Sequence, residues 1–146
     1  MRNSGKNKLT SAVLILAVFA LLQAGCSSKS APQWGKSIEY GSKGTLYYAS
    51  GVTEQEARKL ADYLSKLKSA QGELRPFRLT KENGVYQVRA VTDREVFEKE
   101  VPADQMGPVD AARLLAEDIS GEVFNGAKVE WHFCDKDFKT LRAVGY

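Results

Sequence analysis

The first regular pattern of apolar positions along the chain predicts a helix. One stripe at helical spacing is formed by Ala57, Leu60, Ala61, Leu64 and Leu67. The segment Thr53-Glu54-Gln55-Glu56 stands just before it and has the form of a capping box, in which a threonine hydroxyl and a glutamate carboxylate satisfy each other's backbone amides. We therefore expect the helix to begin after Thr53 and to end before Gly72.

A second helical pattern lies within Asp104–Phe124. Its apolar stripe consists of Ala112, Leu115, Ile119 and Val123. Pro108 suits the first turn of a helix, because a proline there loses no hydrogen bond. Asn125-Gly126 is typical of a helix end.

Paired β-like runs predict three hairpins. The pairs are Ser37–Tyr40 with Thr45–Ala49, Pro76–Lys81 with Val85–Thr92, and Lys128–Asp135 with Phe138–Val144. The central pair has the strongest turn signal, Asn83-Gly84. The segment Asp93–Val101 fits either a charged strand extension or a loop.

The order of these elements predicts an α+β fold with one antiparallel sheet and two helices on one face of it. A helix–strand–strand unit occurs twice, with helix starts near Thr53 and Pro108, which indicates a repeat of architecture. The shape is similar to the doubled saddle of TATA-binding-protein-like folds. That analogy concerns the fold and carries no function.

The N-terminus has the layout of a secretory signal. A basic start with Arg2, Lys6 and Lys8 precedes the apolar run Ala12–Leu22. An uncleaved membrane span needs about 20 apolar residues, so this run is too short to be one.

Small residues and a cysteine close the signal. The sequence Ala24-Gly25-Cys26 resembles the lipobox of bacterial lipoproteins, although Gln23 stands where that motif usually has an apolar or small residue. The resemblance implies cleavage between Gly25 and Cys26 and a lipid anchor on Cys26 with fatty acyl chains such as palmitate. The implied organisation is a signal peptide at residues 1–25, a lipidated tether at 26–36 and a single α+β domain at 37–146.

The resemblance also implies a location. A lipid-anchored chain would sit on a bacterial membrane and face the periplasm or the cell exterior, and Ser27 after the cysteine would permit the outer membrane. The stretch Val123–Gly126, the run from Val129 to Asp135 and the pair Leu141-Arg142 look like a small bacterial domain seen in uncharacterised exported and membrane-linked proteins. That likeness covers roughly Leu46–Val144 and brings no activity with it.

Charge argues against a nucleic-acid partner. The chain has 21 Lys and Arg against 18 Asp and Glu, but three of the basic residues and no acidic ones lie in the leader. The remainder is therefore formally neutral, which removes the electrostatic basis for binding nucleic acid.

The last predicted hairpin carries the residues with the most reactive side chains. Val129, Trp131 and Phe133 alternate with Glu130, His132 and Cys134, so His132 and Cys134 share one face of a strand. Histidine and thiolate are zinc ligands and also form nucleophile pairs. A structural zinc needs four ligands, and the predicted domain has no other histidine or cysteine. We therefore expect no metal site, no cofactor and no catalytic residue, and a half-exposed strand face at His132 and Cys134.

The aromatic residues are better candidates for binding. Tyr47 and Tyr48 are neighbours on a predicted strand and point to opposite faces, so that one of them is available to a partner. We expect a lipid-anchored, non-enzymatic binding or assembly module whose partners are the membrane and an envelope protein. The alternative is a small envelope enzyme that acts on cell wall or uses the Cys134 thiol.

Overall fold

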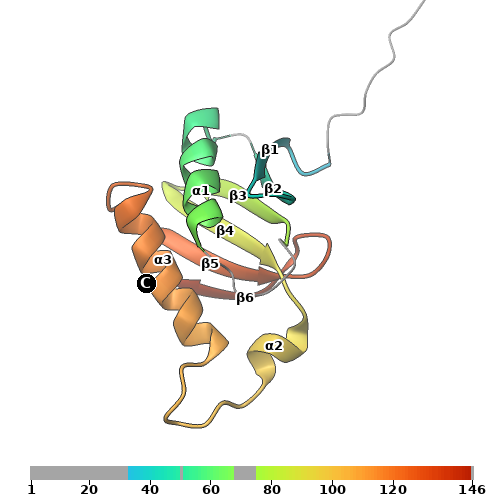
Figure 1. Ribbon diagram of the computed structural model, residues 1–146, viewed down its shortest axis with the longest axis vertical. Helices are drawn as coiled ribbons and strands as arrows, with labels where there is room; N and C mark the ends of the chain where they lie inside the picture. The colour runs from blue at the N-terminus through green and yellow to red at the C-terminus, as the bar shows by residue number, and fades with distance from the viewer. Residues whose placement is uncertain (1–32, 50, 68–74, 146) are drawn as a thin grey trace, which may run out of the picture. The chain divides into compact units, whose positions relative to one another are not determined.

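The computed structural model describes residues 33–49, 51–67 and 75–145 (Figure 1). Its elements are β1 (Lys36–Tyr40), β2 (Gly44–Tyr48), α1 (Glu54–Lys66), β3 (Phe77–Glu82), β4 (Val85–Val91), α2 (Arg94–Glu98), α3 (Pro108–Glu122), β5 (Val129–Cys134) and β6 (Thr140–Gly145). The predicted signal peptide, with its cleavage and lipidation positions Gly25 and Cys26, lies outside the described residues.

The six strands form one mixed sheet in the order β1-β2-β3-β4-β5-β6. The hairpins β1–β2, β3–β4 and β5–β6 are antiparallel, whereas β2 pairs with β3 and β4 pairs with β5 in parallel. The predicted antiparallel sheet, and with it the likeness to a TATA-binding-protein-like saddle, is therefore wrong. Since a helix returns the chain between successive hairpins, the next strand enters beside the last one in the same direction.

A third helix, α2, was not predicted. It lies in the segment that fitted either a strand extension or a loop, and it buries Phe97. The Phe97 ring stacks on Phe133 of β5 with ring centroids 5.1 Å apart. In the described ranges no helix has both the length and the apolar character that a membrane crossing requires.

The predicted local signals set the bounds of the two longer helices. At α1 the Thr53 hydroxyl accepts from the Glu56 amide at 3.2 Å and the Glu56 carboxylate accepts from the Thr53 amide at 2.6 Å, which confirms the capping box. At α3 Pro108 occupies the first turn, and the chain turns away after Glu122 through Asn125 and Gly126, both with positive φ.

The apolar face of the sheet holds the core. We use this name for the face that packs against α1 and α3. One of its rows crosses five strands in register, through Tyr48, Leu79, Val88, Trp131 and Val144. All five residues are buried, in one cluster with the apolar stripes of α1 and α3. The Tyr63 hydroxyl of α1 donates to Asp118 of α3, which ties the two helices together.

Candidate functional site

The polar face is the opposite side of the sheet. Since side chains alternate along a strand, each residue beside the buried row points the other way. The resulting row contains Tyr47, Arg78, Arg89, His132 and Ala143 in register. This row, with the polar residues flanking it on β3, β4 and β5, is the first candidate site.

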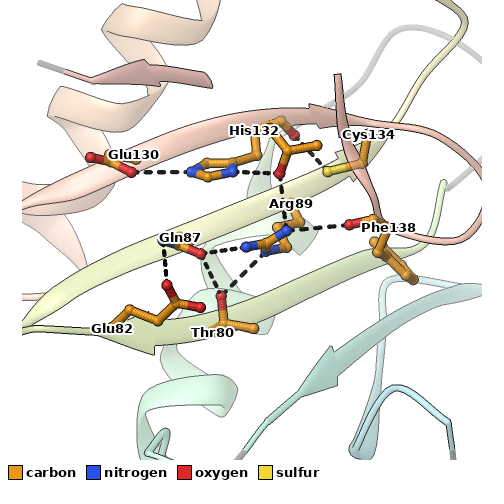
Figure 2. Close-up of polar contacts among 9 residues, drawn as sticks. Thr80, Glu82, Gln87, Arg89, Glu130, His132, Cys134 and Phe138 are labelled. Atoms are coloured by element: carbon orange, nitrogen blue, oxygen red, sulfur yellow. Dashed lines mark hydrogen bonds and ion pairs between the residues drawn. The ribbon is translucent and has the colours of Figure 1, made fainter. Parts of the chain in front are cut away.

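Arg89 is the centre of a hydrogen-bonded network on this face (Figure 2). Its Nη2 donates to Gln87 Oε1 at 2.6 Å and its Nε to Thr80 Oγ1 at 3.3 Å. On the β6 side, Nη1 donates to Thr140 Oγ1 at 3.0 Å and to the Phe138 carbonyl at 3.3 Å. Arg89 therefore ties β3, β4 and the β5–β6 hairpin together through neutral acceptors.

His132 extends the network, and its surroundings fix its tautomer. The side chain is 8% exposed, and burial lowers its pKa, so that the ring is neutral at pH 7. Nε2 lies 3.1 Å from Glu130 Oε2, and a carboxylate accepts only, so Nε2 carries the proton. Nδ1 then accepts from Thr140 Oγ1 at 2.9 Å. Both ring nitrogens are thus engaged.

Cys134 is a packed thiol. The side chain is fully buried, and its sulfur donates to the His132 carbonyl at 3.6 Å. Burial raises the pKa of the thiol, which keeps it protonated and unreactive. The expected half-exposed face at His132 and Cys134 is therefore wrong, because the polar network and the β5–β6 hairpin cover both side chains.

Three aromatic rings cluster at one end of the polar face. The ring centroid of Trp34 lies 5.3 Å from that of Tyr47 and 5.4 Å from that of Phe138, with edge-to-face geometry in both pairs. Tyr47 is half-buried in this cluster, whereas Tyr48 is buried in the core on the apolar face. Of the two candidate tyrosines, Tyr47 therefore belongs to the surface that can bind a partner.

Phe138 has an unusual backbone conformation within this cluster. Its φ is 59°, a left-handed value that bulky side chains rarely adopt. The conformation directs its carbonyl to Arg89 while the ring is buried beside Trp34. Asp135 holds the turn, since its carboxylate accepts from the amides of Asp137 and Lys139. Backbone strain of this kind is concentrated at functional sites.

Arg78 stands beside Arg89 and has no polar partner among the described residues. The side chain is half-buried, and its Nε is buried without a hydrogen bond. Burial, followed by repulsion from Arg89, lowers the pKa of its guanidinium. It is the one arginine in the described residues with a buried, unpaired nitrogen.

A groove between α1 and α3 is the second candidate site. Its volume is about 550 Å³, and it is lined by Tyr63, Leu67, Met106, Ala111, Leu114, Leu115, Glu117, Asp118, Gly121 and Glu122. Met106 is 64% exposed and Leu114 is 50% exposed, so the groove presents two large apolar side chains to solvent. The charged residues of the lining are all acidic.

The predicted site residues and the observed sites overlap in part. The structure brings His132 and Cys134 to the same face, as predicted, and it adds Arg78, Arg89 and Phe138, which we did not predict. The alternation along β4 directs Arg89 to the face opposite that of Val88, and this could be predicted from the sequence. The pairing of Arg89 with Arg78 depends in addition on the register of β3 and β4. Among the described residues no group of three or more His, Cys, Asp or Glu side chains could hold a metal ion.

The domain matches a known protein family. A family model described as a family N-terminal domain matches residues 37–146, which is most of the chain. No curated protein matches the chain, and no solved structure does.

Proposed function

The chain belongs to the family that this N-terminal domain defines, and we propose that it is a lipid-anchored binding module on the outer face of a bacterial membrane. In this proposal Cys26 carries the lipid, and the domain binds an envelope protein without catalysing a reaction. The sequence Ala24-Gly25-Cys26 after a basic and apolar leader supports the anchor.

The groove between α1 and α3 is the observation that carries the binding function. A large exposed apolar side chain costs solubility, and grooves with several of them are typical of sites for protein partners. Leu114 and Met106 stand at its rim, each at least half exposed. Glu117, Asp118 and Glu122 border it and give it a negative charge. The matching partner is a helix with an apolar stripe and flanking lysines or arginines.

Gly121 supports this assignment. It lies in the last turn of α3, and a glycine in a helix interior is about 1 kcal/mol less favourable than alanine, with a smaller cost near the end. A Cβ added there would meet nothing within 4 Å, so the described fold does not require a glycine at this position. Its small surface lets a partner helix approach the backbone of α3 closely.

The surroundings of His132 and Cys134 on the polar face favour a binding function over catalysis by these two residues. The Cys134 thiol is buried and protonated, and both nitrogens of His132 are hydrogen bonded. A nucleophile pair needs an accessible thiolate and a base within reach of it. The alternative of a thiol enzyme therefore has less support than a binding module.

The anchor is tested by metabolic labelling with an alkyne analogue of palmitate. The wild type and Cys134→Ala should incorporate the label, and Cys26→Ala should not. Cys134→Ala is the matched control, since these two positions hold the cysteines of the chain. Equal labelling of Cys26→Ala and the wild type would refute the lipid anchor.

The groove is tested with a synthetic helical peptide that has leucines at i, i+3, i+4 and i+7 and lysines elsewhere. We expect it to bind the full chain in non-ionic detergent, and Leu114→Glu to weaken binding at least tenfold. Val96→Glu is the control, because Val96 is exposed on α2 and does not line the groove. A Glu117→Lys/Glu122→Lys chain should instead prefer the same peptide with glutamates in place of lysines. Equal binding by Leu114→Glu and the wild type would refute the groove assignment.

A further inference from the structure

Arg78 and Arg89 are adjacent positive charges with no carboxylate partner in the described part of the chain. They face each other in register on β3 and β4. The hydrogen-bond acceptors of Arg89 described above are all neutral: two hydroxyls, an amide oxygen and a backbone carbonyl. Like charges directly opposite each other on a sheet destabilise it. The pair therefore needs a counter-charge that the described residues do not provide.

The carboxylates of the same face are engaged elsewhere. Glu130 accepts from His132, and Glu82 accepts from Gln87 at 3.4 Å. Both lie toward the other end of their strands from the aromatic cluster, and neither forms an ion pair with Arg78 or Arg89. Arg58, Arg94 and Arg113, in contrast, each pair with a carboxylate on their own helix.

A buried nitrogen without a partner does not by itself indicate a site. Trp131 Nε1 on the apolar face is also buried without a partner. That indole is neutral and surrounded by the core, so its cost is that of one lost hydrogen bond. Arg78 adds a half-buried charge, a second charge beside it and a position on the face that no described helix covers.

The aromatic cluster borders the arginine pair. Tyr47 stands directly next to Arg78 in register, and Phe138 contacts both Tyr47 and Arg89. Trp34 packs on Tyr47 and Phe138. Aromatic rings lower the local dielectric constant and strengthen the interaction of a guanidinium with an anion. The strained φ of Phe138 fits the same site, since strain is often found where a ligand is held.

We propose that Arg78 and Arg89 form a binding site for an oxyanion of the phosphate type on the polar face. The planar fork of a guanidinium matches a phosphate group with two parallel hydrogen bonds, and the Nε of Arg78 has no hydrogen-bond partner. The phosphate could belong to a free ion or to the headgroup of a lipid. The lipid source is within reach, since Trp34 follows the predicted lipid attachment residue Cys26 by eight positions, at most about 28 Å of extended chain.

The first experiment is a phosphate titration of the full chain in non-ionic detergent at constant ionic strength, followed by the ¹H–¹⁵N resonance of the Arg78 Nε–H group. Phosphate should shift this resonance saturably. Arg78→Lys, which keeps the charge and loses the fork, should weaken phosphate affinity about tenfold, measured in both chains on the Nε–H resonance of Arg89. Arg142→Lys is the control, because Arg142 is an exposed residue of β6, and it should leave the affinity unchanged. The urea midpoint of each variant shows whether it is folded.

The second experiment distinguishes the two sources of phosphate. The same resonance is observed in bicelles of phosphatidylcholine with and without phosphatidylglycerol. A shift on addition of phosphatidylglycerol but not of free phosphate assigns the site to a lipid headgroup, and the reverse result assigns it to a free ion. An Arg78 resonance that responds to neither ligand would overturn the proposal. So would an Arg89 Nε–H resonance that responds equally in the wild type and in a folded Arg78→Gln chain. The groove between α1 and α3 is a separate site, so this result leaves the test of the proposed function unaffected.

Discussion

Two neighbouring rows of the sheet differ by one residue on every strand and have opposite chemistry. The apolar row consists of Tyr48, Leu79, Val88, Trp131 and Val144, and the polar row of Tyr47, Arg78, Arg89, His132 and Ala143. The first row is buried against α1 and α3. The second row is stabilised by hydrogen bonds among its own residues and their neighbours.

The difference shows how one sheet separates stability from recognition. Apolar side chains are stabilised by any close packing, so the helix-covered row needs no specific partner. Buried polar groups need defined partners, and each group left without one costs free energy. The polar row meets this need at Arg89 and His132 and fails to meet it at Arg78, which is why we place the binding site there.

The largest effect should come from the apolar row. Leu79 is fully buried at the centre of the sheet, so Leu79→Ala should reduce the free energy of unfolding by about 3 kcal/mol. The measurement is urea unfolding followed by tryptophan fluorescence. Ala143→Gly, at the exposed end of the polar row, is the control and should cost much less. A loss below about 1 kcal/mol for Leu79→Ala would contradict a close-packed apolar face.

The sequence predicted the elements of this sheet better than their arrangement. The capping box at Thr53, Pro108 in the first turn of α3 and Asn83-Gly84 in the β3–β4 turn are local signals, and the structure confirms each. The pairing of β2 with β3 and of β4 with β5 is not a local property. Two β–α–β connections within one sheet give parallel pairs, because the helix returns the chain to the edge at which the previous strand began.

The same limit applies to the candidate site. The alternation along β5 predicted that His132 and Cys134 share a face, which the register confirms. Their burial depends on Arg89 from β4 and on the β5–β6 hairpin. The sequence of β5 alone therefore does not predict it. The juxtaposition of Arg78 and Arg89 follows from the Asn83-Gly84 hairpin, whose two-residue turn fixes the register of β3 and β4. The sequence therefore contained this pair, but only as a consequence of the turn.

The second prediction concerns the polar edge of the apolar face, where Glu56 of α1 meets Lys81 and Tyr86. Burial alone would raise the pKa of Glu56, but hydrogen bonds from Tyr86, Thr53 and Lys81 outweigh it and lower the pKa to about 2. The carboxylate form therefore stabilises the folded state above the ordinary value of 4.5, and this stability is lost as the pH falls from 4.5 toward 2.

The expected loss is about 2 kcal/mol, after allowance for the partial exposure of this side chain. Urea midpoints measured across this pH range should fall steeply in the wild type and less steeply in Glu56→Gln. Glu54→Gln, on the exposed side of the same helical turn, should keep the slope of the wild type. Identical slopes for Glu56→Gln and the wild type would show that Glu56 does not hold this edge.

The third prediction concerns the hydroxyl of Thr140, which is hydrogen bonded to two residues of the polar row. Thr140→Val keeps the shape of the side chain but leaves His132 Nδ1 without its donor and Arg89 with one acceptor fewer. The free energy of unfolding should fall by about 1.5 kcal/mol. Thr140→Ser retains the hydroxyl and should restore most of the loss. If the serine and valine variants were equally stable, the network would not contribute to stability.

The smallest effect is the pH dependence of the polar row near neutrality. Burial lowers the pKa of His132 below its ordinary value of 6.5, with Arg89 acting in the same direction and Glu130 and Glu82 opposing it. The unfolded chain then binds more protons than the folded one below pH 6.5, so the stability that the neutral ring contributes is present above that pH and is lost as the pH falls. Between about pH 7 and 5.5 the free energy of unfolding should fall by less than about 1 kcal/mol.

His132 is the one histidine of the chain, so His132→Asn should flatten the curve of unfolding free energy against pH in this range. A rise in stability as the pH falls would mean that the ring is charged in the folded state, and the polar row would then hold a third positive charge beside Arg78 and Arg89.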